Sequence, residues 1–230
     1  MKRCYFTSLL AFVLIPILIS AGEKQAGKIV LKEGTVLKTN INCTDSRYAS
    51  DLYIRKGDRI RTGKDSRAQL LLADGTGLII YERSDIIINN VKDSDNKKIT
   101  LIYADYGKFK IIQNNNYMET SLVIRTKTSV IKTVQATFCL IASEDESGIF
   151  VSTGEAGFAN IESSVSEAFV IKEGEESFIS RGKAPSVPGK ISASLQSSWL
   201  SRMILSRDGK HILRSGIENG PLDWPFMKKD

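Results

Sequence analysis

Short apolar runs alternate with turn residues along most of the chain. Runs rich in β-branched side chains begin at Lys28 and recur up to the glycine- and proline-rich segment 181–190. They predict about twelve short strands with a turn signal roughly every 8 to 12 residues, a spacing typical of a β-sandwich, a barrel or a solenoid-like β domain. Strands do not alternate with helical patterns, which argues against a doubly wound α/β enzyme. The predicted fold class is therefore all-β.

The stretch 55–80 holds the strongest turn signals. The dipeptide Asp74-Gly75 lies between two apolar runs and predicts a β-hairpin, because glycine accepts the positive φ of the turn. Glycines at such corners let the chain reverse where a β-carbon would clash, and turn aspartates hydrogen-bond nearby backbone amides. We therefore expect structural turn residues at Gly57, Asp58, Thr62, Gly63, Asp74 and Gly75.

The hydrophobic period changes after Pro188. Apolar residues then recur at i+4 spacing with polar residues between them, which predicts one amphipathic helix. We expect its apolar stripe to pack on the sheet; an interface with a partner is the alternative. The segment 183–230 is predicted to hold this helix and an irregular tail. The residues of the stripe are Ile191, Leu195, Trp199 and Met203.

The first 22 residues have the composition of a secretory signal. Two basic residues near the start precede an apolar run, and small residues at 20–22 suit cleavage by a signal peptidase. A membrane-spanning helix needs roughly 20 apolar residues, and Pro16 interrupts this run. The alternative is an uncleaved N-terminal anchor, which would be the chain's only membrane contact. We therefore expect a signal peptide at 1–22, a β domain at 23–182, and a periplasmic or secreted mature chain.

Cysteine use agrees with export. Without Cys4, which lies in the signal segment, the chain keeps Cys43 and Cys139 as a possible disulfide. The alternative is two separate small hydrophobic residues, since Cys139 stands between Phe138 and Leu140. Zinc needs about four ligands, which two distant cysteines and one histidine do not provide. We therefore expect no metal site.

The basic character of the chain is confined to its C-terminal segment. Residues 22–182 contain 22 Lys+Arg and 22 Asp+Glu, whereas residues 183–230 contain eight basic and four acidic residues. A nucleic-acid-binding domain normally carries a basic patch on its folded surface. We therefore expect no nucleic-acid partner.

No catalytic arrangement stands out in the sequence. The single histidine, His211, lies in the basic tail, away from any predicted nucleophile. Glycine-rich phosphate-binding motifs are absent, and the acidic turns 93–96 and 144–146 lack the ligand spacing of a calcium loop. Nothing places the turn carboxylates Asp58 and Asp74 together as an acid–base pair. We therefore expect no enzyme activity and no cofactor.

The order of these signals resembles the FecR domain family, named after an iron-uptake signalling protein. Downstream of the opening motifs, Gly107-Lys108-Phe109 is similar to the family's glycine-containing strand, and 123–141 is similar to its segment I-x-T-P-x-A-x-x-x-V-R-G-T-x-F. The resemblance covers residues 27–180. The residues that match the family's first half are Gly57, Asp58, Ile60, Thr62, Gly63, Leu70 to Leu72, Asp74, Gly75, Thr76 and Leu78 to Ile80.

The sequence departs from the family pattern in two places. Thr126-Lys127 stands where the family has Thr-Pro, and Gln135-Ala136-Thr137 stands where it has Arg-Gly-Thr. Recognition through that arginine or that glycine is therefore not implied for this chain.

The resemblance implies a role outside the cytoplasmic membrane. Full-length family members carry a cytoplasmic N-terminal domain and a transmembrane helix, and they transmit a signal from an outer-membrane receptor to a sigma factor. We expect this chain to be a stand-alone exported form, a binding module for signalling or assembly in the cell envelope. Its expected partner is an envelope protein or a cell-wall polysaccharide. The alternatives are a structural envelope scaffold without a signalling role and, less favoured, a polysaccharide-active enzyme that uses carboxylates.

Overall fold

The structure is a computed structural model that describes residues 25–40, 51–92, 98–113, 120–162 and 164–192. These residues form fifteen β-strands, and no helix occurs among them. The all-β prediction is confirmed. The predicted C-terminal helix lies outside the described residues, apart from its first two positions. Among the residues that the structure describes, no helix is long and apolar enough to cross a membrane.

The strand bounds follow the predicted apolar runs. The fifteen strands are β1 (Gln25–Glu33), β2 (Val36–Thr39), β3 (Tyr53–Arg55), β4 (Asp58–Thr62), β5 (Arg67–Leu72), β6 (Gly77–Ile80), β7 (Ser84–Lys92), β8 (Lys98–Ile112), β9 (Thr120–Arg125), β10 (Ser129–Thr133), β11 (Ala136–Ala142), β12 (Glu146–Asn160), β13 (Ala168–Lys172), β14 (Glu175–Ser180) and β15 (Gly189–Lys190).

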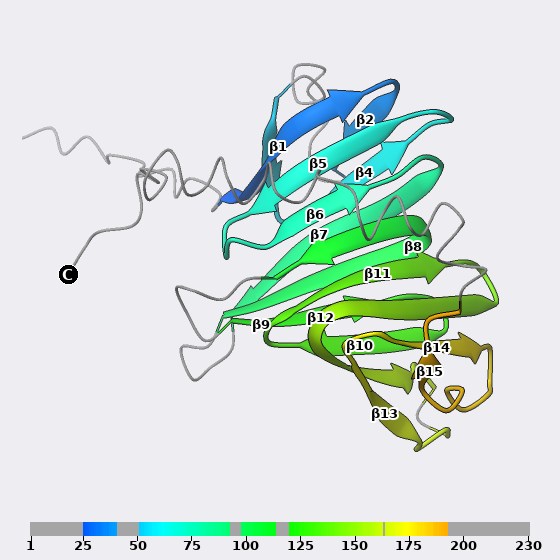
Figure 1. Ribbon diagram of the computed structural model, residues 1–230. Helices are drawn as coiled ribbons and strands as arrows, with labels where there is room; N and C mark the ends of the chain where they lie inside the picture. The colour runs from blue at the N-terminus through cyan, green and yellow to red at the C-terminus, as the bar shows by residue number, and fades with distance from the viewer. Residues whose placement is uncertain (1–24, 41–50, 93–97, 114–119, 163, 193–230) are drawn as a thin grey trace, which may run out of the picture.

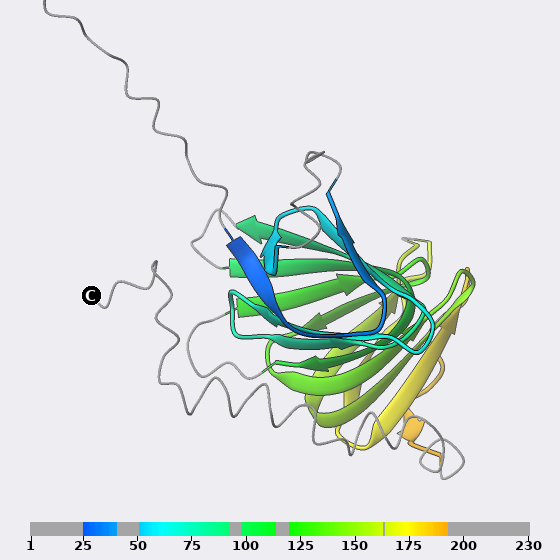
Figure 2. The same ribbon diagram turned by 90° about the horizontal axis from the view of Figure 1, so that it is seen from above.

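The strands are stacked in two layers, from β1 at one end to β13, β14 and β15 at the other (Figures 1 and 2). We call the layers sheet A and sheet B. Sheet A has the order β3-β1-β5-β6-β8-β11-β12-β14-β15, and sheet B has the order β2-β4-β7-β8-β9-β10-β12-β13. The β8–β9 pair is parallel and the other pairs are antiparallel.

Two long strands, β8 and β12, belong to both layers. The first part of β8 pairs with β7 and β9 in sheet B, and from Gly107 onward it pairs with β6 and β11 in sheet A. In β12 the order is reversed, with sheet A pairing up to Gly154 and sheet B pairing from Glu155. As a result β8, β11, β12, β10 and β9 close into a five-strand barrel, and the remaining strands extend both sheets on either side of it.

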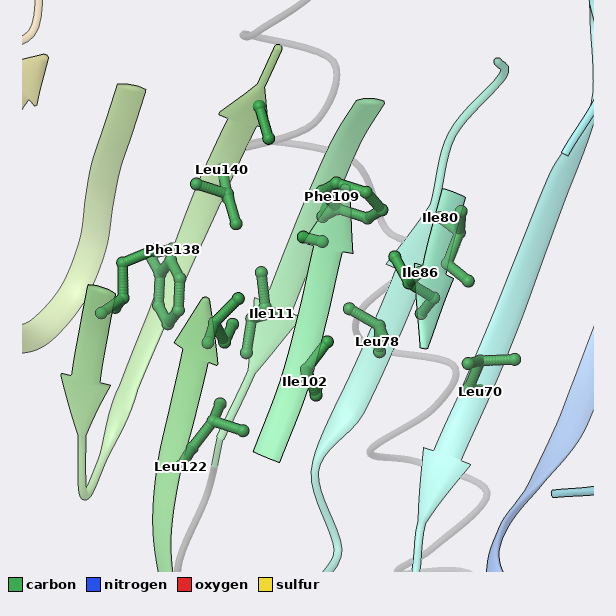
Figure 3. Packing of buried hydrophobic residues seen from close by; sticks show 14 of the residues in the cluster. Leu70, Leu78, Ile80, Ile86, Ile102, Phe109, Ile111, Leu122, Phe138 and Leu140 are labelled. Carbon is green, nitrogen blue, oxygen red and sulfur yellow. The ribbon is translucent and has the colours of Figure 1, made fainter. Parts of the chain in front are cut away.

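A single large hydrophobic core fills the space between the layers (Figure 3). It contains side chains from both sheets, because alternate residues of each strand point inward. Residues of this core seen in Figure 3 are Leu70, Leu78, Ile80, Ile86, Ile102, Phe109, Ile111, Leu122, Phe138 and Leu140, all 1% exposed or less.

Glycine is required where β8 crosses between the layers. Gly107 has a φ of +126°, a conformation that residues with a side chain rarely adopt. A β-carbon at this position would lie 2.2 Å from Ser84 Oγ and 2.6 Å from Ser84 Cα. Ser84 Oγ is itself held in place, since it accepts a hydrogen bond from the Lys108 amide at 3.0 Å. Strand β8 therefore continues through this glycine and changes layers there.

Candidate functional site

The first family motif forms the turn between β3 and β4. Gly57 has a φ of +83°, and its amide donates a hydrogen bond to Ile88 O at 2.8 Å. The side chain of Asp58 is buried and accepts the Arg55 amide at 2.9 Å and Asn40 Nδ2 at 2.6 Å. The carboxylate therefore ties the turn to the end of β2, which is a structural task.

Thr62 and Gly63 stand at the corner where β4 leads to β5. Thr62 Oγ1 donates to Tyr81 O at 2.5 Å and accepts the Ser84 amide at 3.0 Å, so it links this corner to the next one along the sheet. Gly63 does not have the positive φ expected of a reversal; Asp65 has it, at +51°. A β-carbon on Gly63 would instead meet Thr35 Cβ at 3.2 Å, so close packing is what favours glycine there.

The predicted hairpin joins β5 and β6. Gly75 has a φ of +86°, and Asp74 Oδ1 accepts the Thr76 amide at 2.8 Å. A β-carbon on Gly75 would have no atom within 4 Å, so the backbone conformation and not a clash is the reason for this glycine. The other oxygen of Asp74 accepts the hydroxyl of Thr100 in β8. The two motif aspartates thus satisfy separate turns, and the contacts found for them do not join them as an acid–base pair.

A hydroxyl network occupies the position of the family's Thr-Pro. Thr126 Oγ1 accepts the amides of Thr128 at 3.1 Å and Ser129 at 2.8 Å, which closes the turn between β9 and β10. Its hydroxyl also lies 2.7 Å from Ser147 Oγ at the start of β12. Lys127, which replaces the proline, forms an ion pair with Glu144. The threonine thus retains a structural role without the proline.

Two carboxylates of the 144–146 turn, Glu144 and Asp145, belong to exposed ion pairs. The hydrogen bond from Lys127 is the main reason why the pKa of Glu144 lies below its ordinary value, and Arg181 contributes a second hydrogen bond. No group of three or more His, Cys, Asp or Glu side chains suited to a metal occurs among the residues that the structure describes. His211 and the 93–96 turn lie outside those residues.

Cys139 has a free thiol and is 1% exposed. It packs with Phe150 in a small apolar cluster, and burial raises the pKa of the thiol to about 12. This environment favours the alternative in which Cys139 acts as a small hydrophobic residue. Cys43 lies outside the described residues, so its pairing stays a prediction.

The outer side of sheet B is the candidate binding surface. Its side chains alternate with the core residues of β4, β7, β8, β9 and β10, and most are partly or fully exposed. They combine arginine, tyrosine and aliphatic residues, a composition that is enriched at protein interfaces. We call this surface the sheet B face; it consists of Arg59, Arg61, Asp85, Ile87, Leu101, Tyr103, Asp105, Val123, Arg125, Val130 and Lys132.

A buried carboxylate organises one end of the sheet B face. Asp85 is 1% exposed and accepts Arg59 Nε at 2.7 Å and Arg59 Nη2 at 2.8 Å, a two-point ion pair. Arg61 Nε donates to the same carboxylate at 2.7 Å, and Arg59 Nη2 also reaches Asp105 Oδ2 at 2.7 Å. The hydrogen bond to Asp85 is the main cause that raises the pKa of the Arg59 guanidinium. Two arginines are therefore held in fixed positions at the surface.

The sequence analysis missed this network. The residues stand 24 and 26 positions apart in the chain, and strand pairing between β4 and β7 brings them together. The sequence did indicate that the two arginines lie together, because Arg59 and Arg61 alternate with core residues and therefore share the outer side of β4. The acidic partner could be identified only from the register of a non-local pair.

Comparison with known proteins gives the same fold. A crystal structure of a "putative anti-sigma factor" from Parabacteroides distasonis matches with a TM-score of 0.50 and 17% identity, over 62% of this chain and 64% of that chain. A second crystal structure with the same description matches with a TM-score of 0.51 and 16% identity, over 62% and 63% of the two chains. The match thus spans less than two thirds of that protein. No curated protein matches the sequence.

The family model described as FecR protein matches residues 58–157, from the start of β4 to the sheet B part of β12. This range includes the hairpin, the change of layers at Gly107, the hydroxyl network and the whole sheet B face. The family is non-catalytic, in agreement with the structural tasks of Asp58 and Asp74. Residues 58–157 of this chain therefore form a FecR domain.

Proposed function

We propose that this protein is an exported, non-catalytic signalling module of the cell envelope that binds a partner protein through the sheet B face. The single observation that supports the proposal most is this exposed surface on a FecR domain, with arginines fixed by a buried carboxylate. The resemblance to an anti-sigma factor supports a role in signalling. Export is inferred from the predicted signal peptide at 1–22.

The chemistry of the sheet B face favours a protein over a polysaccharide as the partner. The charges of the Arg59–Asp85 network balance, since two arginines meet two aspartates. Beyond this network, Ile87, Leu101 and Val123 supply partly buried aliphatic area. Tyrosine and arginine carry a large share of the binding energy in many protein interfaces. Tyr103 and Arg125, which are register neighbours on β8 and β9, are the expected centre of the contact.

Site-specific photocrosslinking in living cells tests this proposal. A photoreactive phenylalanine analogue replaces Tyr103 in one variant and Val187 in a control variant; Val187 is 78% exposed and lies outside the sheet B face. We expect a discrete crosslinked protein from the first position only, in the envelope fraction. Crosslinks from the control position alone would contradict the proposal, as would crosslinks to cell wall instead of protein. Recovery of the mature chain from the cytoplasm would contradict it too.

A charge-reversal pair tests the role of the same surface in signalling. Arg125→Glu places a negative charge at the expected centre, and Lys172→Glu makes the same change on β13. We expect Arg125→Glu to weaken partner binding by about tenfold or more and to alter transcription in the same direction as a gene deletion. A scaffold without a signalling role would bind its partner through the same face but would leave transcription unchanged.

A further inference from the structure

Part of the outer side of sheet A differs from the sheet B face because it is closed to solvent. A row of register neighbours crosses it through the pairs of β14, β12, β11, β8, β6 and β5. The residues before and after each of the central members point into the core, so the row itself points away from it. We call this row the sheet A stripe; it consists of Glu176, Phe150, Cys139, Lys110, Ile79 and Gln69.

Five members of the sheet A stripe are buried although they lie outside the two-layer core, and Glu176 at the β14 end is partly exposed. Phe150 and Ile79 are 0% exposed and Cys139 is 1% exposed. Beside them, a second small apolar cluster joins Ile79 to two neighbours on the same side, Leu71 and Ile112. On a sandwich of two sheets such an outer face would contact water, as the sheet B face does. A segment of some kind must therefore cover it.

The end of the described chain leads onto this side of the sheet. Ile191 packs against the cluster of Cys139 and Phe150, and its amide donates to Gly174 O at 3.0 Å. The next amide, that of Ser192, donates to the Glu176 carboxylate. Both contacts place Ile191 and Ser192 at the β14 and β12 end of the sheet A stripe.

We propose that the predicted amphipathic helix 191–204 covers the sheet A stripe. Ile191 is the first residue of the predicted apolar stripe and already packs on this side. The thirteen steps from 191 to 204 span ~20 Å at about 1.5 Å per residue. The five strands from β12 to β5 lie about 4.8 Å apart, which gives ~19 Å from the first to the last. The helix therefore has the length of the surface that it covers, with Leu195, Trp199 and Met203 against the sheet.

The rate at which Cys139 is alkylated measures how often this cover opens. In a mature chain with Cys43→Ser, Cys139 is the single cysteine, and its thiol reacts only when the cover opens. We expect Trp199→Asp and a chain ending at Ser192 to increase the alkylation rate by about tenfold or more. The matched control Ser201→Asp, on the polar side of the predicted helix, keeps the original rate. Unchanged alkylation in the shortened chain would overturn the proposal.

A crosslink keeps the proposal testable if the shortened chain does not fold. In a cysteine-free chain, the pair Gln69→Cys and Met203→Cys is expected to form a disulfide on mild oxidation within one molecule, whereas Gln69→Cys with Ser201→Cys is not. Two other outcomes would contradict the proposal. Alkylation that rises on dilution, or crosslinks between molecules, would show that a second copy covers the stripe. Fast alkylation of the pure full chain that slows only with envelope extract would indicate another protein.

Discussion

Replacement of Gly107 by alanine tests the bend by which β8 crosses from sheet B to sheet A. The new β-carbon has two costs. A residue with a side chain at a φ of +126° costs about 1–3 kcal/mol. Contact with Ser84 at 2.2–2.6 Å forces a shift of packed atoms and costs about 1–3 kcal/mol more. We therefore expect Gly107→Ala to lower the free energy of unfolding by about 2–6 kcal/mol, a large part of the ~5–15 kcal/mol typical of a domain.

Gly75→Ala is the matched control, because it has a similar backbone requirement without the contact. Gly75 has a φ of +86°, and a β-carbon at this position would have no atom within 4 Å. Its replacement is expected to cost about 1–3 kcal/mol, from the backbone alone. Urea unfolding of the mature chain, followed by far-ultraviolet circular dichroism, gives both values. Equal losses for the two variants would refute the packing argument.

A double variant separates the two costs at the bend. Ser84→Gly removes the two side-chain atoms nearest to the new β-carbon and leaves Ser84 Cα at 2.6 Å. Combined with Gly107→Ala, it should cost less than the sum of the single changes by about 1 kcal/mol or more, because the contact is largely relieved. Strict additivity would mean that the backbone conformation alone explains the loss.

Three further predictions concern the network, the thiol and the core. Asp85→Asn leaves two arginines without a buried counter-charge and should cost about 3 kcal/mol in urea unfolding, whereas Asp65→Asn, with a side chain 80% exposed, should cost almost nothing. Because burial raises the pKa of the Cys139 thiol from 9.0 to about 12, the native Cys43→Ser chain should show almost no ultraviolet absorbance from thiolate between pH 8 and 10, with the Cys139→Ser variant of that chain as the reference, while the urea-unfolded chain should titrate through its ordinary pKa; the same titration in both states would contradict the burial. Phe109→Ala should destabilise by about 3–5 kcal/mol and Val187→Ala by less than about 0.5 kcal/mol; similar values would place Phe109 outside the core.

Local signals in the sequence were sufficient for the parts of the fold that are local in the chain. The hairpin at Asp74-Gly75 pairs strands separated by four residues, and its turn chemistry requires only neighbours. Alternation of apolar residues identified the strands for the same reason. Gly63 shows the limit of such reasoning, because its need for glycine comes from Thr35, which is distant in the chain.

The arrangement of strands in space depends on contacts that local patterns do not contain. The backbone of β8 continues through Gly107 and there changes its partners from β7 and β9 to β6 and β11. The same limit applies to the sheet B face, where the charge pairs of Asp85 arise from the register between strands. Alternation indicates which side chains share a surface, but not which strands lie next to one another.

The continuity of β8 and β12 through both layers has a mechanical consequence. A sandwich whose layers are joined only by loops can shear, one sheet sliding over the other, whereas here each covalent crossing lies inside a hydrogen-bonded strand. Displacement of either layer therefore breaks backbone hydrogen bonds in the other. The domain should melt in a single calorimetric transition and respond to a ligand as a rigid body. A force applied at one sheet would then reach the opposite sheet through the backbone of these two strands.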